Sequence, residues 1–162
     1  MADALVERWG LGRAKERFKG RLAEGRAGGA PGEQSPLRVA VLMPQTYMNE
    51  AGRSVGPARG SLRLPLERVL VVHDEIDLPF GDVRTRLGGG LAGHNGLKSL
   101  KRELGGAEFP RVRVGVGRPD STDPEIVSGY VLGRFRQSRA EVAELTERAV
   151  AAVERVLAGE LE

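Results

Sequence analysis

The segment RVLVVHDEIDLP (68–79) is the feature that most constrains the fold. It begins as a continuous apolar run and ends in acidic residues. An apolar run of this kind is typical of a strand buried in a parallel sheet that helices cover on both faces. In such sheets the carboxyl ends of the strands hold the functional groups, which gives Asp74 and Glu75 a place in a site. The segment therefore predicts an α/β fold.

Strand and helix patterns alternate along the rest of the chain. Strands are expected at 17–26, 38–44, 83–87 and 111–117, and helices at 2–9, at 95–104 and from residue 138 onward. The strand 38–44 is expected to be buried on both faces, after a turn at 25–36. The last helix begins with a capping box formed by Ser138 and Glu141, followed by an apolar stripe of Val142, Leu145, Ala149, Val153 and Val156. This alternation predicts a single three-layer α/β domain over 1–162, with a twisted, mostly parallel mixed sheet flanked by helices.

Composition excludes several kinds of site. The chain has no cysteine, which rules out disulfides, thiolate metal sites and cysteine nucleophiles. With only two histidines and no His or Cys cluster, neither a metal nor another cofactor is expected. No stretch resembles a signal peptide or a membrane span, so a cytoplasmic protein without a membrane partner is expected. The net charge of +3, with arginine and lysine concentrated between residues 84 and 118, is compatible with a nucleic-acid partner.

The segment LGGGLAGHNGLK (87–98) lies between an expected strand and an expected helix. Gly88, Gly90 and Gly93 match the G-x-G-x-x-G pattern of dinucleotide-binding turns. The preceding strand bears arginines, however, and no acid follows about twenty residues later to bind a ribose. A dinucleotide-binding module therefore stays the weaker alternative, beside a glycine-rich turn with no ligand.

His94 and Asn95 follow these glycines, and each has an ordinary structural explanation. A histidine in a turn is often a capping or packing residue, and an asparagine at a helix start is commonly the N-cap. Polar residues also follow two other expected strands, at 47–49 and at 73–75. Because the carboxyl ends of the strands in an open α/β sheet meet at one crevice, these residues are expected to share a site. An acid, two carboxamides and nearby arginines suit an ester or amide substrate that bears phosphates.

The chain resembles bacterial peptidyl-tRNA hydrolase in four segments that keep the family's order and spacing. They are PQTYMNEAG (44–52), VVHDEIDLPFG (71–81), LGGGLAGHNGLKSL (87–100) and FPRVRVGVGRP (109–119). A further segment, VSGYVLGRF (127–135), is similar to the family's lid. The resemblance implies a monomeric enzyme that hydrolyses the ester between a peptide, or an N-blocked amino acid, and the 3′ end of tRNA.

The resemblance also implies roles for four polar residues. Asp74 is similar to the carboxylate that orients the family's catalytic histidine. Tyr47 and Asn49 match positions that contact the substrate around the ester and the 3′ CCA end of the tRNA. Asn95 matches the asparagine that holds the substrate and a bound water. The partner implied is therefore peptidyl-tRNA, bound at its acceptor end.

Three basic residues are implied to bind the tRNA backbone. Arg86, Lys98 and Arg113 fall at or near positions that resemble the family's phosphate-binding surface. Affinity that depends on neutralising phosphates weakens as salt is added. A steep salt dependence of tRNA binding is therefore expected.

The family's general base has no counterpart among these residues. Members of the family begin with a buried strand and a Thr-Arg-His-Asn motif, and neither is found in this sequence. His73 is not expected to replace that histidine, because it neighbours Asp74 on a strand where successive side chains point to opposite faces. His94 matches no base of the family. We expect a hydrolase that lacks its N-terminal strand and histidine, most simply through a misassigned start. The alternative is a catalytically silent tRNA-binding protein. Little hydrolase activity is expected in either case, because losing a general base costs about 10²–10⁴-fold in rate.

Overall fold

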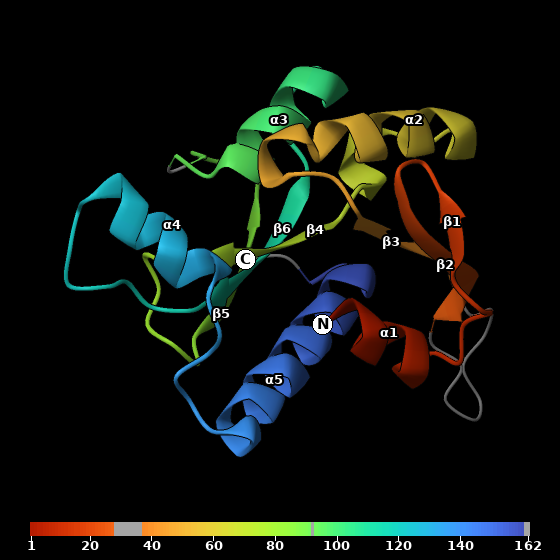
Figure 1. Cartoon of the computed structure of the whole chain (residues 1–162). Helices are drawn as coiled ribbons and strands as arrows, with labels where there is room; N and C mark the ends of the chain where they lie inside the picture. The colour runs from red at the N-terminus through yellow and green to blue at the C-terminus, as the bar shows by residue number, and fades with distance from the viewer. Residues whose placement is uncertain (28–36, 92, 161–162) are drawn as a thin grey trace. The chain divides into compact units, whose positions relative to one another are not determined.

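The computed structural model describes residues 1–27, 37–91 and 93–160, and within them the chain packs as two compact units (Figure 1). Unit 1 comprises Met1–Val69 and Gly89–Glu108, and unit 2 comprises Leu70–Gly88 and Phe109–Glu162. Strands and helices occur in both units, so the predicted α/β class is confirmed. In the described ranges no helix is both long and apolar enough to cross a lipid bilayer.

Unit 1 contains an antiparallel sheet with the strand order β1–β2–β3. Helix α1 contacts β3, and α2 packs against α3. The elements are α1 (Ala2–Arg8), β1 (Lys15–Arg17), β2 (Gly20–Ala27), β3 (Leu37–Pro44), the short 3-10 helix η1 (Met48–Glu50), α2 (Gly52–Leu62), a second 3-10 helix η2 (Leu66–Arg68) and α3 (Asn95–Leu104). The prediction that 38–44 is buried on both faces is wrong, since Val41 is the one buried residue of β3. An antiparallel sheet can leave one face to solvent, which a parallel sheet does not.

The turn between β1 and β2 consists of Phe18 and Lys19, whose φ angles are 54° and 53°. Two successive positive φ angles are those of a type I′ hairpin turn, in which Asn-Gly is the usual pair. Each side chain with a Cβ costs roughly 1–2 kcal/mol in this conformation. The sequence gives no turn signal here, so the single strand predicted at 17–26 is two strands in the structure. The turn predicted at 25–36 lies mostly outside the described residues, and its first three residues end β2.

Unit 2 contains a mixed sheet in the order β4–β6–β5, with β4 parallel and β5 antiparallel to the middle strand β6. Its elements are β4 (Val71–Glu75), β5 (Val83–Leu87), β6 (Pro110–Gly115), α4 (Pro124–Leu132) and α5 (Arg139–Leu157). The prediction of a mixed sheet is confirmed. The prediction that its strands are mostly parallel is not, since one of the four described strand pairings is parallel. The connection from β4 to β5, residues 76–82, is shorter than the dozen or so residues that a parallel crossover needs.

Helix α5 begins with the predicted capping box, in which Ser138 and Glu141 each bond the other's backbone N–H. It contacts β5 and β6 and buries Leu145, Ala149 and Val153, three members of the predicted stripe. Helix α4, in contrast, has no buried residue. The capping box and the stripe thus fix both the start of α5 and the face that it packs on the sheet.

Candidate functional site

Helix η1 and the N-terminus of α3 pack against each other in unit 1. A Cβ at Gly96 would lie 2.7 Å from Sδ of Met48, so a larger residue there would require the Met48 side chain to move. Arg102 of α3 donates from Nη2 to the backbone carbonyl of Asn49 at 3.3 Å. The two contacts position the segment that contains Asn49 beside the start of α3.

Four of the predicted site residues lie at this junction. Tyr47 is 81% exposed, and Asn49 and Asn95 are also exposed. Lys98 is exposed on α3, one helical turn beyond Asn95. The structure therefore brings Tyr47, Asn49, Asn95 and Lys98 together in unit 1, with their polar side chains open to solvent. The sequence did not single out Arg102, whose role depends on a contact between residues far apart in the chain.

His94 is the N-cap of α3. Its Nδ1 accepts a hydrogen bond from the backbone N–H of Leu97 at 3.2 Å, and Asn95 is the first residue of the helix. The capping explanation of His94 is thus confirmed, whereas the idea that Asn95 is the N-cap is wrong. Because the cap is provided by its neighbour, the carboxamide of Asn95 is not needed to cap α3.

Replacing His94 by alanine is expected to lower the free energy of unfolding by about 1 kcal/mol, because the backbone N–H of Leu97 loses its acceptor. His94→Asn supplies another good capping side chain and is expected to retain most of the stability. Urea denaturation of the three proteins measures the difference. Equal losses in the alanine and asparagine variants would show that the histidine stabilises α3 in another way.

The strand register places the remaining predicted residues in unit 2. His73 lies opposite Arg113, and Arg86 lies opposite Arg111, which is two residues from Arg113 on the same strand. Directly opposite residues share a sheet face, and successive residues alternate. Arg86 and Arg113 therefore share one face with His73, and Asp74 projects from the other face. The structure brings the two arginines together but separates them from the carboxylate.

Arg113 is paired with Glu75, an acid for which the sequence predicted a place in the site but no partner. Its Nε lies 3.5 Å from Oε2 of Glu75, whose side chain is 7% exposed, against 22% for Arg113. The other oxygen, Oε1, accepts from the backbone N–H of Asp77 at 3.3 Å. Part of the positive charge of Arg113 is thus neutralised inside the protein, which leaves less of it for a phosphate. In the sequence, the position of Glu75 next to Asp74 is the one indication of the pair that Glu75 forms with Arg113.

The segment 127–135, expected to resemble a lid, contacts the rest of unit 2 through Tyr130 and Phe135. Tyr130 donates from its hydroxyl to the carbonyl of Val116 at 2.5 Å. The rings of Phe80 and Phe135 meet edge to face, with centroids 5.9 Å apart. Leu132 is 75% exposed, so the segment leaves apolar surface open to solvent.

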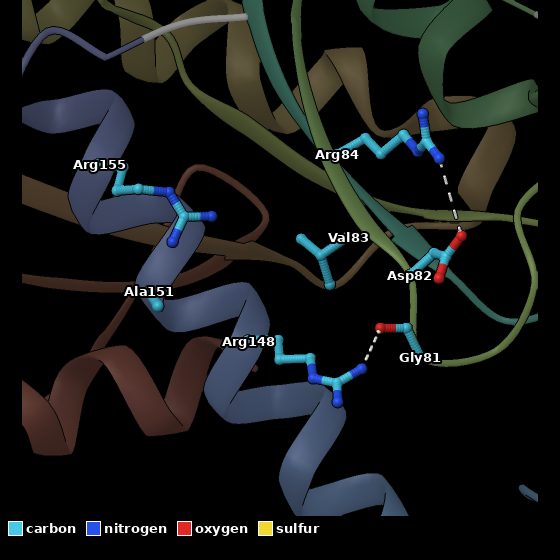
Figure 2. A pocket seen from close by; sticks show the side chains of 7 residues that line it. All are labelled: Gly81, Asp82, Val83, Arg84, Arg148, Ala151 and Arg155. Carbon is cyan, nitrogen blue, oxygen red and sulfur yellow. Dashed lines mark hydrogen bonds and ion pairs between the residues drawn. The ribbon is translucent and has the colours of Figure 1, made fainter.

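A hollow of about 480 Å³ lies between α5 and the start of β5, as Figure 2 shows. Arg148 donates from Nη1 to the carbonyl of Gly81 at 2.9 Å across this hollow. Its lining consists of Gly81, Asp82, Val83, Arg84, Arg148, Ala151 and Arg155. None of the predicted site residues is among them, so this hollow is not the predicted site.

Comparison with known proteins gives one consistent result. The family model described as peptidyl-tRNA hydrolase matches residues 1–162. The peptidyl-tRNA hydrolase of Granulibacter bethesdensis is 47% identical over 139 residues, which are 86% of this chain and 67% of that protein. The peptidyl-tRNA hydrolase of Gloeobacter violaceus is 43% identical over 162 residues, covering 99% of this chain and 77% of that protein.

Solved structures agree with these sequences. The crystal structure of peptidyl-tRNA hydrolase from Acinetobacter baumannii superimposes with a TM-score of 0.79 at 32% identity, covering 98% of this chain and 76% of that one. The family model, the related sequences and the solved structure are thus all peptidyl-tRNA hydrolases.

Proposed function

This chain belongs to the peptidyl-tRNA hydrolase family of ester hydrolases, and from that membership we propose that it cleaves the ester joining a peptide, or an N-blocked amino acid, to the 3′ end of tRNA. The observation behind the proposal is the match of the family model to residues 1–162. The exposed cluster of Tyr47, Asn49 and Asn95 supplies side chains that suit such a substrate. Its product is free tRNA, which returns to translation.

In this proposal the two carboxamides hold the reacting end of the substrate. Asn49 and Asn95 each offer N–H donors to an ester carbonyl, whose oxygen becomes negative when water attacks. The ring of Tyr47, which is largely exposed, is available to stack on an unpaired base of the CCA end. The N-terminus of α3 adds a partial positive charge beside Asn95. Together these groups favour the developing oxyanion over the ground-state ester.

Asp74 has a positioning role in the proposed reaction. The resemblance implies that a carboxylate orients the family's histidine general base. Asp74 matches the position of that carboxylate in this sequence. We propose that neither His73 nor His94 is this base, in keeping with the lack of a Thr-Arg-His-Asn motif among the 162 residues. Water is the nucleophile, and the family's reaction as the resemblance implies it has a histidine remove the proton of that water as it attacks the ester.

Arg86, Lys98 and Arg113 are proposed to bind phosphates of the tRNA. Arg86 and Lys98 are exposed, which supports direct contact with the backbone. Arg113 is expected to contribute less, because it is half-buried and paired with Glu75. We further propose that the two units act as one domain, because a single family model matches both of them. We also propose that the protein is a monomer and works in the cytoplasm, where translation supplies the substrate.

Titration with fluorescently labelled tRNA tests the proposed partner. The three contacts of Arg86, Lys98 and Arg113 alone contribute about −2 to −3 to the logarithmic salt slope, which is roughly a 20- to 50-fold loss of affinity between 50 and 200 mM salt. The dinucleotide-binding alternative predicts instead that NAD or FAD raises the melting temperature. A rise with either dinucleotide and no salt-dependent binding of tRNA would reject the proposed function.

A further inference from the structure

The tip of the β1–β2 hairpin in unit 1 concentrates positive charge. Residues 13–21 include five basic residues and one acidic residue, a net charge of +4, against +3 for the whole chain, so the other 153 residues sum to −1. The five basic residues are all exposed: Arg13, Lys15, Arg17, Lys19 and Arg21. None of them has a role in the proposed reaction. A patch this dense and this open is the electrostatic signature of a polyanion partner.

The hairpin register gathers part of this charge away from acidic neighbours. Glu16 lies opposite Arg21, so those two side chains share one face. Lys15 and Arg17 project from the other face, opposite Leu22 and Gly20. In the described part of the chain neither Lys15, Arg17 nor Lys19 forms an ion pair. We call Lys15, Arg17 and Lys19 the hairpin cluster.

The turn at the tip of the hairpin has a strained backbone conformation. Phe18 and Lys19 both have positive φ angles, where Asn-Gly is the usual pair. The guanidinium of Arg17 lies over the ring of Phe18, with Cζ 4.5 Å from the ring centroid. Backbone strain that persists in a structure commonly marks a functional requirement for the side chains involved. Here the strained turn carries Lys19, and the contact with the ring of Phe18 orients Arg17.

A hydrogen bond locates the hairpin cluster relative to the candidate substrate residues of the same unit. Arg17 donates from Nη2 to Oγ of Ser61, the next-to-last residue of α2, at 3.4 Å. Tyr47 and Asn49 precede the opposite end of α2. A helix of 11 residues is about 16 Å long, so the cluster lies roughly that far from the residues proposed to bind the ester. Phosphates succeed one another about every 3.4 Å along one strand of a nucleic-acid helix, so the separation corresponds to roughly five nucleotides.

We propose that the hairpin cluster binds phosphates of the tRNA acceptor helix, about five nucleotides from the ester. The inference rests on the proposed function, because it takes tRNA as the polyanion. Contacts of this kind add affinity and fix the orientation of the RNA without reading its sequence. The hairpin cluster would therefore select substrates that have a tRNA body over short esters.

Two triple variants with the same loss of charge test the hairpin cluster. The first is Lys15→Gln/Arg17→Gln/Lys19→Gln, and the matched control is Arg38→Gln/Arg68→Gln/Arg139→Gln, three exposed arginines from other elements. The first variant is expected to bind tRNA about tenfold or more weakly at 100 mM salt, with a salt slope smaller by 2 to 3, whereas the control changes by less than about threefold. Both triple variants should keep the circular dichroism spectrum of the wild type.

A second ligand separates this inference from the proposed function. The trinucleotide CCA with an N-acetyl-aminoacyl group is too short to reach the hairpin, so wild type and the first variant are expected to bind it equally. Equal losses of tRNA affinity in the two triple variants, or a matching loss for the trinucleotide, would overturn the hairpin contact and leave the proposed function intact. No salt-dependent binding of tRNA by the wild type would reject both.

Discussion

Hydrolysis of N-acetyl-aminoacyl-tRNA by residues 1–162 is expected to be about 10²–10⁴-fold slower than hydrolysis by the Gloeobacter violaceus relative if, as we propose, neither histidine of this chain is the general base. Nδ1 of His94 accepts the N–H of Leu97, so protonating that nitrogen would break the helix cap. His73 is 8% exposed, and its Nδ1 lies 2.8 Å from the carbonyl oxygen of Asp74, which makes Nδ1 the donor. Its other nitrogen, Nε2, is buried.

Two variants provide the control for this prediction. His94→Asn preserves a cap, and His73→Asn preserves a donor toward the carbonyl of Asp74. Neither is expected to lower the residual rate of ester cleavage. Cleavage by the wild-type chain at the rate of the Gloeobacter violaceus protein, or a fall to the uncatalysed rate in either variant, would identify a histidine of this chain as the base.

Gly52→Ala is expected to lower the free energy of unfolding by about 1–3 kcal/mol, because it forces α2 away from α3. A Cβ at Gly52 would lie 2.4 Å from the backbone oxygen of Ser99 and 2.5 Å from Cγ of Glu103. The backbone oxygen cannot move without shifting α3. The hydrogen bond from the N–H of Gly52 to Oγ of Ser99, now 2.9 Å, would lengthen as well. Since Asn49 precedes α2 and Asn95 begins α3, the same shift is expected to weaken substrate binding.

Gly60→Ala is the matched control on the same helix. No atom lies within 4 Å of a Cβ built at Gly60, and the residue is exposed. Alanine there is expected to stabilise the protein by about 0.5–1 kcal/mol, because glycine is the poorer helix former. Urea denaturation should therefore give changes of opposite sign for the two variants. Destabilisation by both would mean that α2 has little tolerance for alanine, whatever its contact with α3.

Local patterns in the sequence predicted several elements closely. The spacing of Leu97, Leu100 and Leu104, with Gly105 after them, gave the bounds of α3 as the structure has them, and all three leucines are buried. The capping box at Ser138 likewise marked the start of α5. These signals act over one or two helical turns, and the residues that produce them are neighbours in the chain.

Features that depend on distant residues could not be predicted in this way. The pairing of Arg113 with Glu75 follows from the parallel register of β4 and β6, and the contact of Met48 with Gly96 from the packing of η1 on α3. The turn at Phe18 lacks the Asn-Gly pair that normally signals it. The N-cap of α3 is His94, although asparagine, which follows at position 95, has the stronger preference for the N-cap position.

The decisive question is whether this chain is a hydrolase or binds tRNA without cleaving it. The measurement is the rate at which N-acetyl-amino acid leaves its tRNA with protein in excess, in a buffer that contains imidazole as a small-molecule base. If the chain is a hydrolase, the protein should accelerate cleavage beyond imidazole alone, and Asp74→Asn and Asn95→Ala should abolish that acceleration. If the tRNA is fully bound and its ester is cleaved no faster than with imidazole alone, the chain is a silent tRNA-binding protein and the proposed reaction is wrong.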